Sequence, residues 1–172
     1  SDVQAKIDND TRVVRAFLAS QGYRAEDVDL GRFEVTDMQS REYQQQGVAA
    51  RFILAQTVIV RTPDVDRVRN TTRSLNELVR QGVVLQDFQG PSYIFTGLNG
   101  VRPAMIAQAT ASARSGAEQF ARDSGTGLGP IKSANQGSFE ILARDQTSNG
   151  GDEATSLNKR VRVVTSVTYS LR

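Results

Sequence analysis

Hydrophobic residues follow two spacings along the chain, the three-to-four-residue spacing of helices and the alternation of strands. Three segments have the helical spacing, and each ends at a glycine that tolerates the left-handed conformation of a helix end, namely Gly22, Gly82 and Gly125. The three hydrophobic stripes are formed by Val3, Ile7, Val14, Phe17 and Leu18, by Val65, Val68, Leu75, Leu78 and Val79, and by Ile106, Ala109, Ala113, Ala117 and Phe120. The pattern predicts three helices, of which the second begins at residues 62–64 and the third at residues 101–103.

Strand-like alternation occupies much of the chain between these helices. Residues 50–61 form the strongest predicted strand and carry hydrophobic residues on both faces, which is typical of a central strand covered on each side. Residues 161–171 alternate most regularly, which predicts an antiparallel strand with one buried face. Further strands are predicted at residues 30–38, 92–96 and 128–144, the last with a bend at Gly137.

These elements predict an α+β fold with a mixed, largely antiparallel sheet and three helices packed on it. The predicted order is α-β-β-α-β-α-β-β, and a helix at the very start indicates a first strand upstream of the chain. Length favours a single domain over residues 1–172, since 172 residues can bury a real core. The polar, glycine-containing segments near residues 37–49 and 145–158 are predicted to be flexible loops.

The composition removes whole classes of chemistry, because the chain has no His, no Cys and no Trp. Zinc fingers, cysteine nucleophiles and serine–histidine triads are excluded, and no cofactor or metal residues are assigned. Carboxylates remain as acid–base groups. The close sets all lie in loops or at a helix start, where capping is their ordinary role: Asp27 and Asp29, Asp64 and Asp66, Asp152 and Glu153. We therefore predict no catalytic residues and a protein that is not an enzyme, with a carboxylate-only hydrolase ranking third among the functions considered.

Charge and hydropathy limit the classes of partner that the chain is expected to bind. The 21 basic and 19 acidic residues nearly balance, which argues against a dedicated nucleic-acid-binding protein. No apolar run reaches 18 residues, so no membrane span is predicted. The chain opens Ser1-Asp2-Val3 without Met and without a signal peptide, which is typical of a mature or trimmed product.

Two groups of residues are candidates for contacts with a partner. Arg160, Arg162 and Arg172, next to Lys159, form a basic row on the outer face of the last predicted strand, for which an ordinary solvated face is the favoured alternative. On the third helix, small residues permit a close helix contact, either with the chain's own sheet or with another subunit: Ala109, Ala113, Gly116 and Ala117. Gly116 costs about 1 kcal/mol against alanine within a helix, which a tight contact would explain.

Three stretches resemble the SIMPL-domain family, bacterial envelope proteins of the YggE and periplasmic immunogenic protein type. The first is the alanine-spaced third helix with its exit through Gly125 to Leu128-Gly129-Pro130-Ile131, and the others are Val58–Arg61 with the helix after it and the ending from Lys159 to Leu171. Departures are the absent first strand and Gly116, where a helix former is common. The resemblance implies a periplasmic or envelope-associated α/β protein, a homo-oligomer loosely linked to stress tolerance. It supplies no catalytic residues.

The leading hypothesis from the sequence is a non-enzymatic cell-envelope protein that acts through oligomerisation and surface contacts. The alternative is a binding module for an anionic ligand or a partner protein. A symmetric apolar contact would favour the first, and a pocket with converging arginines the second.

Overall fold

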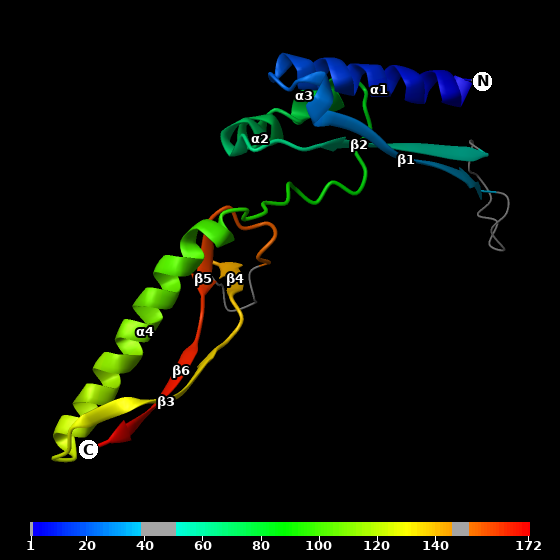
Figure 1. The fold of residues 1–172 in the computed structure, drawn as a ribbon. Coiled ribbons are helices and arrows are strands. Elements are labelled where there is room, and N and C mark those ends of the chain that lie inside the picture. The colour runs from blue at the N-terminus through cyan, green and yellow to red at the C-terminus, as the bar shows by residue number, and fades with distance from the viewer. Residues whose placement is uncertain (1, 39–50, 146–151) are drawn as a thin grey trace. The chain divides into compact units, whose positions relative to one another are not determined.

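The computed structural model describes residues 2–38, 51–145 and 152–172, and it divides into two compact units, Ser1–Pro91 and Ser92–Arg172 (Figure 1). The α+β class is confirmed, and the elements follow roughly the predicted order. Most of the two predicted loops, residues 39–50 and 146–151, lies outside the described residues.

The first unit combines helices with one antiparallel hairpin. Its elements are α1 (Asp2–Ser20), the short 3-10 helix η1 (Ala25–Asp27), β1 (Val28–Asp37), β2 (Phe52–Val60), α2 (Val65–Arg73) and α3 (Asn76–Arg80). β1 and β2 pair from Val28 opposite Val60 to Asp37 opposite Phe52. A bulge between Leu30 and Phe33 inserts one extra residue into β1, so the hydrophobic residues on either side of the bulge stay on the same face.

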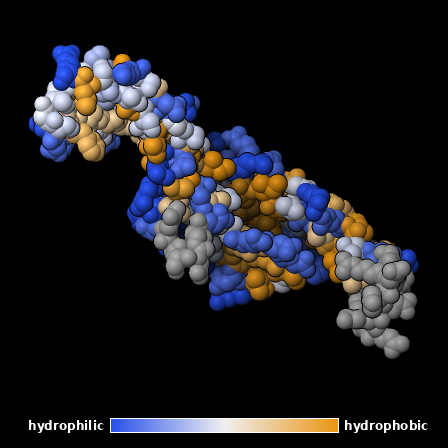
Figure 2. Space-filling model, turned by 90° about the horizontal axis from the view of Figure 1, so that it is seen from below, coloured by the Kyte–Doolittle hydropathy of each residue, from blue (hydrophilic) through white to orange (hydrophobic). Residues whose placement is uncertain are grey.

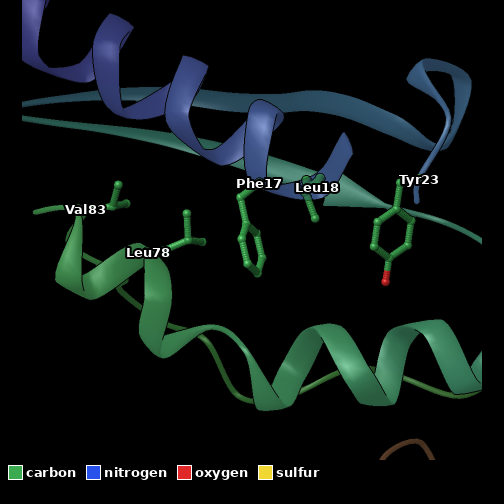
Figure 3. Packing of buried hydrophobic residues seen from close by; sticks show 5 residues of the cluster. All are labelled: Phe17, Leu18, Tyr23, Leu78 and Val83. Atoms are coloured by element: carbon green, nitrogen blue, oxygen red, sulfur yellow. The ribbon is translucent and has the colours of Figure 1, made fainter. Parts of the chain in front are cut away.

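One cluster of buried side chains holds this unit together, and Figure 3 shows its members: Phe17, Leu18, Tyr23, Leu78 and Val83. The hydrophobic stripe of α1 supplies the first two, as predicted, and the last two come from α3 and the segment after it. Val28, Val58 and Val60 pack against the cluster from the hairpin. The core therefore lies at the end of the hairpin where β1 begins and β2 ends.

The predicted second helix is broken into α2 and α3. Asp64 caps α2, since its Oδ1 accepts the Arg67 N–H at 3.0 Å. The break falls at Ser74 and Leu75, shortly after three weak helix formers at residues 70–72. Two threonines of that run bond back to carbonyls four residues earlier, a local bond that often bends helices.

The second unit consists of a long helix and two strand pairs. Its elements are α4 (Leu98–Asp123), β3 (Leu128–Gln136), β4 (Glu140–Ala143), β5 (Lys159–Arg162) and β6 (Thr165–Leu171). β3 pairs with β6 and β4 with β5, both antiparallel. The Ala109, Ala113 and Ala117 stripe of α4 is half-buried, and α4 contacts β6 and β3. The strand region predicted at residues 128–144 is interrupted at residues 137–139, so that β3 and β4 are separate strands of different sheets.

Further details differ from the sequence prediction, and α4 begins at Leu98 instead of at residues 101–103. The described strands form three two-stranded sheets, all antiparallel, rather than one mixed sheet. Residues 92–96 form no strand. The last strand is interrupted at Val163 and Val164, and its parts β5 and β6 belong to different sheets. Phe120 is 76% exposed instead of buried, because the covered face at this end of α4 passes through Ala117 and Ala121, four residues apart.

Candidate interaction surface

The basic row predicted on the last strand is not gathered into one patch. Arg160 and Arg162 lie on β5, whereas Arg172 follows the far end of β6, a seven-residue strand that spans about 23 Å. Lys159 points inward, since its side chain is 7% exposed and its Nζ lies 2.8 Å from Glu153 Oε1.

The two arginines of β5 form an ion pair and a hydrogen bond with neighbouring residues of their own unit. Arg162 Nη1 lies 3.3 Å from Glu140 Oε2 on β4, and Arg160 Nη2 donates to the Arg144 carbonyl at 3.3 Å. Arg144 in turn hydrogen-bonds Asp145 and holds the pKa of that carboxyl below its usual value, with the charge of Arg160 acting in the same direction. This face therefore carries opposite charges side by side, which is typical of a solvated surface.

The small residues of α4 have two different environments. Ala109, Ala113 and Ala117 lie on the stripe that α4 turns toward its own strands. Gly116 is exposed, and a Cβ added there would meet no atom within 4 Å. The first three residues are thus used for packing within the unit, and nothing in the described part of the chain approaches Gly116 closely.

A surface that the sequence reasoning missed lies on the β1–β2 hairpin. Strand alternation and the pairing with β2 place four hydrophobic residues on one face, which we call the hairpin surface: Leu30, Phe33, Val35 and Phe52. Between 40% and 58% of each residue is exposed. The core cluster covers this same face only at its other end, at Val28, Val58 and Val60. Figure 2 shows that hydrophobic residues lie uncovered on the face of the molecule that it draws.

Charged residues border the hairpin surface. The Arg51 guanidinium carbon lies 4.9 Å from the centre of the Phe52 ring, and Arg51 Nη2 lies 3.3 Å from Asp37 Oδ2. The ion pair of Arg32 with Glu34 does not belong to this border, because strand alternation places Glu34, between Phe33 and Val35, on the opposite face of β1. An apolar centre with a charged rim is the usual anatomy of a protein interface.

The outer edge of β2 is the second open feature of the hairpin. In the described part of the chain, β2 pairs with β1 alone. Its nine residues include no charged residue and no proline, although natural edge strands are commonly blunted by both. The sequence signal was the hydrophobic composition on both faces of residues 50–61, which predicted a central strand. The structure leaves that central-type strand at an edge.

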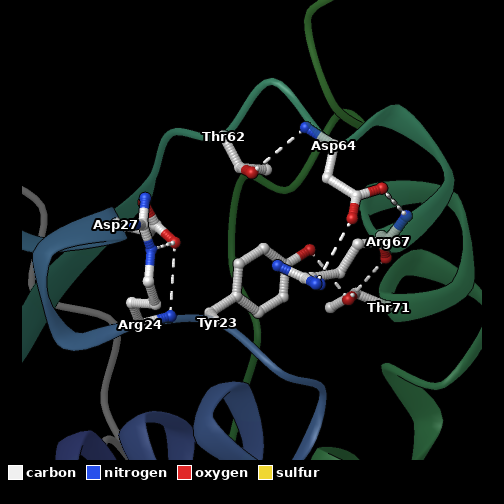
Figure 4. A network of polar contacts seen from close by, with 7 residues as sticks. All are labelled: Tyr23, Arg24, Asp27, Thr62, Asp64, Arg67 and Thr71. Atoms are coloured by element: carbon white, nitrogen blue, oxygen red, sulfur yellow. Dashed lines mark hydrogen bonds and ion pairs between the residues drawn. The ribbon is translucent and has the colours of Figure 1, made fainter.

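A polar network fixes the base of the hairpin against α2 (Figure 4). The Tyr23 hydroxyl and Thr71 Oγ1 are hydrogen-bonded at 2.8 Å, and the Arg67 guanidinium lies 5.8 Å from the centre of the Tyr23 ring. Arg24 bonds Asp27 through both its backbone N–H and its guanidinium. These hydrogen bonds hold the pKa of the buried Asp27 carboxyl below its usual value, so Asp27 stays ionised to lower pH.

The other carboxylates that the sequence singled out are also engaged in local structure. Each makes an ion pair or a cap: Asp29 with Arg61, Asp64 and Asp66 with Arg67 and Arg69, Glu153 with Lys159, and Asp152 with the Ala154 N–H. The expected capping role is seen at Asp64, and the other contacts of these carboxylates are ion pairs or local hydrogen bonds.

A shallow pocket of about 220 Å³ lies where α1 meets β1, lined by Arg15, Ala19, Tyr23, Arg24, Ala25 and Val28. Arg24 is matched by Asp27 and by Glu26, whose Oε1 lies 2.6 Å from Arg24 Nη1. Arg15 makes no ion pair with any residue that the structure describes. The pocket is smaller than the roughly 300–1,000 Å³ of most ligand sites.

Comparison with a family model identifies the family of the chain. The model of a family described as "SIMPL: Protein of unknown function (DUF541)" matches residues 1–169, essentially the whole chain. A search of curated proteins found no match. Within the described residues, no helix combines the length and the hydrophobicity that crossing a bilayer requires.

Proposed function

Since the chain belongs to the SIMPL family, whose function is unknown, we propose that it is a non-enzymatic cell-envelope protein that works by self-association and surface contacts. The observation that carries this proposal is the hairpin surface, a hydrophobic sheet face that the described part of the chain covers at one end only. Large exposed apolar patches with a polar rim mark interaction sites on soluble proteins.

The free energy gained by burying the hairpin surface is large enough to support association. Complete burial of a large hydrophobic side chain contributes about 1.5–3 kcal/mol, so covering four that are about half exposed contributes about 3–6 kcal/mol per copy. Two copies that bury this surface against each other would gain about twice that. The gain is comparable to the roughly 4–15 kcal/mol lost in translational and rotational freedom on association. Hydrogen bonding along the open β2 edge would add to it.

Self-association through the hairpin surface is tested with a matched pair of serine variants. Val35→Ser removes a hydrophobic residue from the surface, and Val84→Ser removes one that is 70% exposed elsewhere in the first unit. Sedimentation velocity should show an oligomer for the wild type and Val84→Ser, and a shift toward monomer for Val35→Ser. If the wild type sediments as a monomer at all concentrations, self-association is excluded.

The cell-envelope location and the link to stress tolerance come from the family resemblance. Fractionation of the source cells with an antibody against this chain tests the location. Enrichment in the periplasmic or envelope fraction is expected, and recovery with cytoplasmic markers would contradict it.

A binding module for an anionic ligand is the second candidate, and the pocket beside α1 favours it. Arg15, which forms no ion pair with the described residues, supplies a positive charge next to the apolar Ala19 and Val28. An anionic amphiphile such as octanoate suits that combination. Calorimetric titration should show binding to the wild type and loss of binding with Arg15→Ala. Equal heats for both proteins would remove this candidate.

A further inference from the structure

Residues 92–96 have the sequence of a strand, Ser-Tyr-Ile-Phe-Thr, and lie outside every described sheet. Their burial nevertheless alternates as in a strand. Tyr93 and Phe95 are partly buried, whereas Ile94 between them is 83% exposed. Aromatic and β-branched residues in this alternation favour a pleated strand with one face packed.

The segment is held in place although it has no strand partner. The Tyr93 N–H donates to the Ala154 carbonyl at 2.7 Å, the one backbone hydrogen bond that residues 92–96 make within the described residues. The Phe95 ring packs on Gly97, where an added Cβ would lie 3.1 Å from it. Gly97 is the N-cap of α4, so the segment is anchored next to a long helix. A segment that is already anchored loses less conformational freedom when it pairs than a free one would.

The β2 edge is the best complement to such a strand on this chain. β1 is interrupted by a bulge and carries Arg32 and Glu34, and β3 contains Pro130 and Lys132. β4 and β5 have only four residues each, and β6 alternates as a strand with one solvated face. Among the strands that the structure describes, β2 alone combines nine residues, no charge, no proline and hydrophobic residues on both faces.

We propose that residues 92–96 of one copy add as a third strand to the open β2 edge of a second copy. This inference rests on the proposed self-association and names the segments that would carry it. A second copy is the occupant because, among the described residues, each chain carries one unpaired strand-like segment and one unpaired central-type edge, in equal numbers. Because the donor and the acceptor are different surfaces, the exchange produces a reciprocal dimer or a ring where its rotation closes and an open filament where it does not. Ile94 then enters an interface instead of facing solvent.

Cysteine cross-linking tests the pairing directly, because the chain has no cysteine of its own. One preparation carries Ile94→Cys, and a second, mass-tagged preparation carries a single cysteine on β2, at Ile53, Ala55 or Thr57 in turn. The two are mixed and oxidised, so any heterodimeric disulfide joins different copies. We expect a cross-link with at least one β2 position and none with the control Ser112→Cys on α4.

A sedimentation experiment separates failure of this inference from failure of the proposed function. Ile94→Asp should weaken association at least about 30-fold, because a buried isoleucine is replaced by a charge, while the matched control Val84→Asp should not. A wild-type monomer would overturn both proposals. A wild-type oligomer that shows no β2 cross-link and tolerates Ile94→Asp would overturn the strand exchange and leave self-association standing.

Discussion

Leu78→Ala is the sharpest test of what holds the first unit together. Leu78 is 1% exposed and lies in the cluster with Phe17 and Val83 (Figure 3). Truncation removes three buried carbon atoms and leaves a cavity between α1 and α3. Leucine-to-alanine changes in cores destabilise by about 2–5 kcal/mol, and an entire domain is stable by only about 5–15 kcal/mol. The unit has few other buried side chains to compensate for the loss.

Urea denaturation followed by circular dichroism measures this effect at a fixed protein concentration. With a slope of about 2 kcal/mol per molar urea, the midpoint should fall by about 1–2.5 M. Val79→Ala is the matched control, since the neighbouring Val79 is 58% exposed and its truncation should change stability by less than about 0.5 kcal/mol. Equal effects of the two substitutions would refute the assignment of Leu78 to the core.

Three further predictions follow from single contacts. Asp27→Asn should destabilise the protein near neutral pH, and the difference in stability from wild type should shrink as the pH falls below about 4. The reason is that Arg24 lowers the pKa of Asp27 from its ordinary 3.8. Thermal melts between pH 7 and pH 2 measure this difference, and a difference that stays constant with pH would contradict the prediction. Gly129→Ala should cost about 1–3 kcal/mol in urea denaturation, since its Cβ would lie 2.7 Å from the Ser170 carbonyl oxygen, and a neutral result would show that β3 and β6 separate easily. Gly116→Ala should stabilise α4 by up to about 1 kcal/mol without changing the sedimentation of the protein, whereas loss of the oligomer would show that Gly116 lies in an interface.

Much of the local structure could be predicted because it depends on neighbouring residues. The helix ends at Gly22, Gly82 and Gly125 are examples, and all three glycines adopt a positive φ, as a helix end of this kind requires. The buried Phe17 and Leu18 of α1 follow equally from spacing.

The features that could not be predicted depend on contacts between segments that are distant in sequence. Phe120 fits the helical stripe of α4 but is exposed, because the buried side of the helix at this end contains Ala121 instead. Residues 92–96 have strand propensity, which cannot specify a partner strand. The hairpin surface was missed because hydrophobic strand residues predict burial, and the sequence does not say which part of a sheet face a helix reaches. The inward position of Lys159 likewise depends on Glu153, which lies outside the strand.

Copies of this chain are proposed to associate through their uncovered sheet surfaces, and the proposed function depends on this association. Light scattering on the purified protein, over a hundredfold range of concentration, measures its mass most directly. We expect masses that are multiples of 18.8 kDa and fall toward one chain on dilution. A constant mass of one chain across the whole range would contradict the claim.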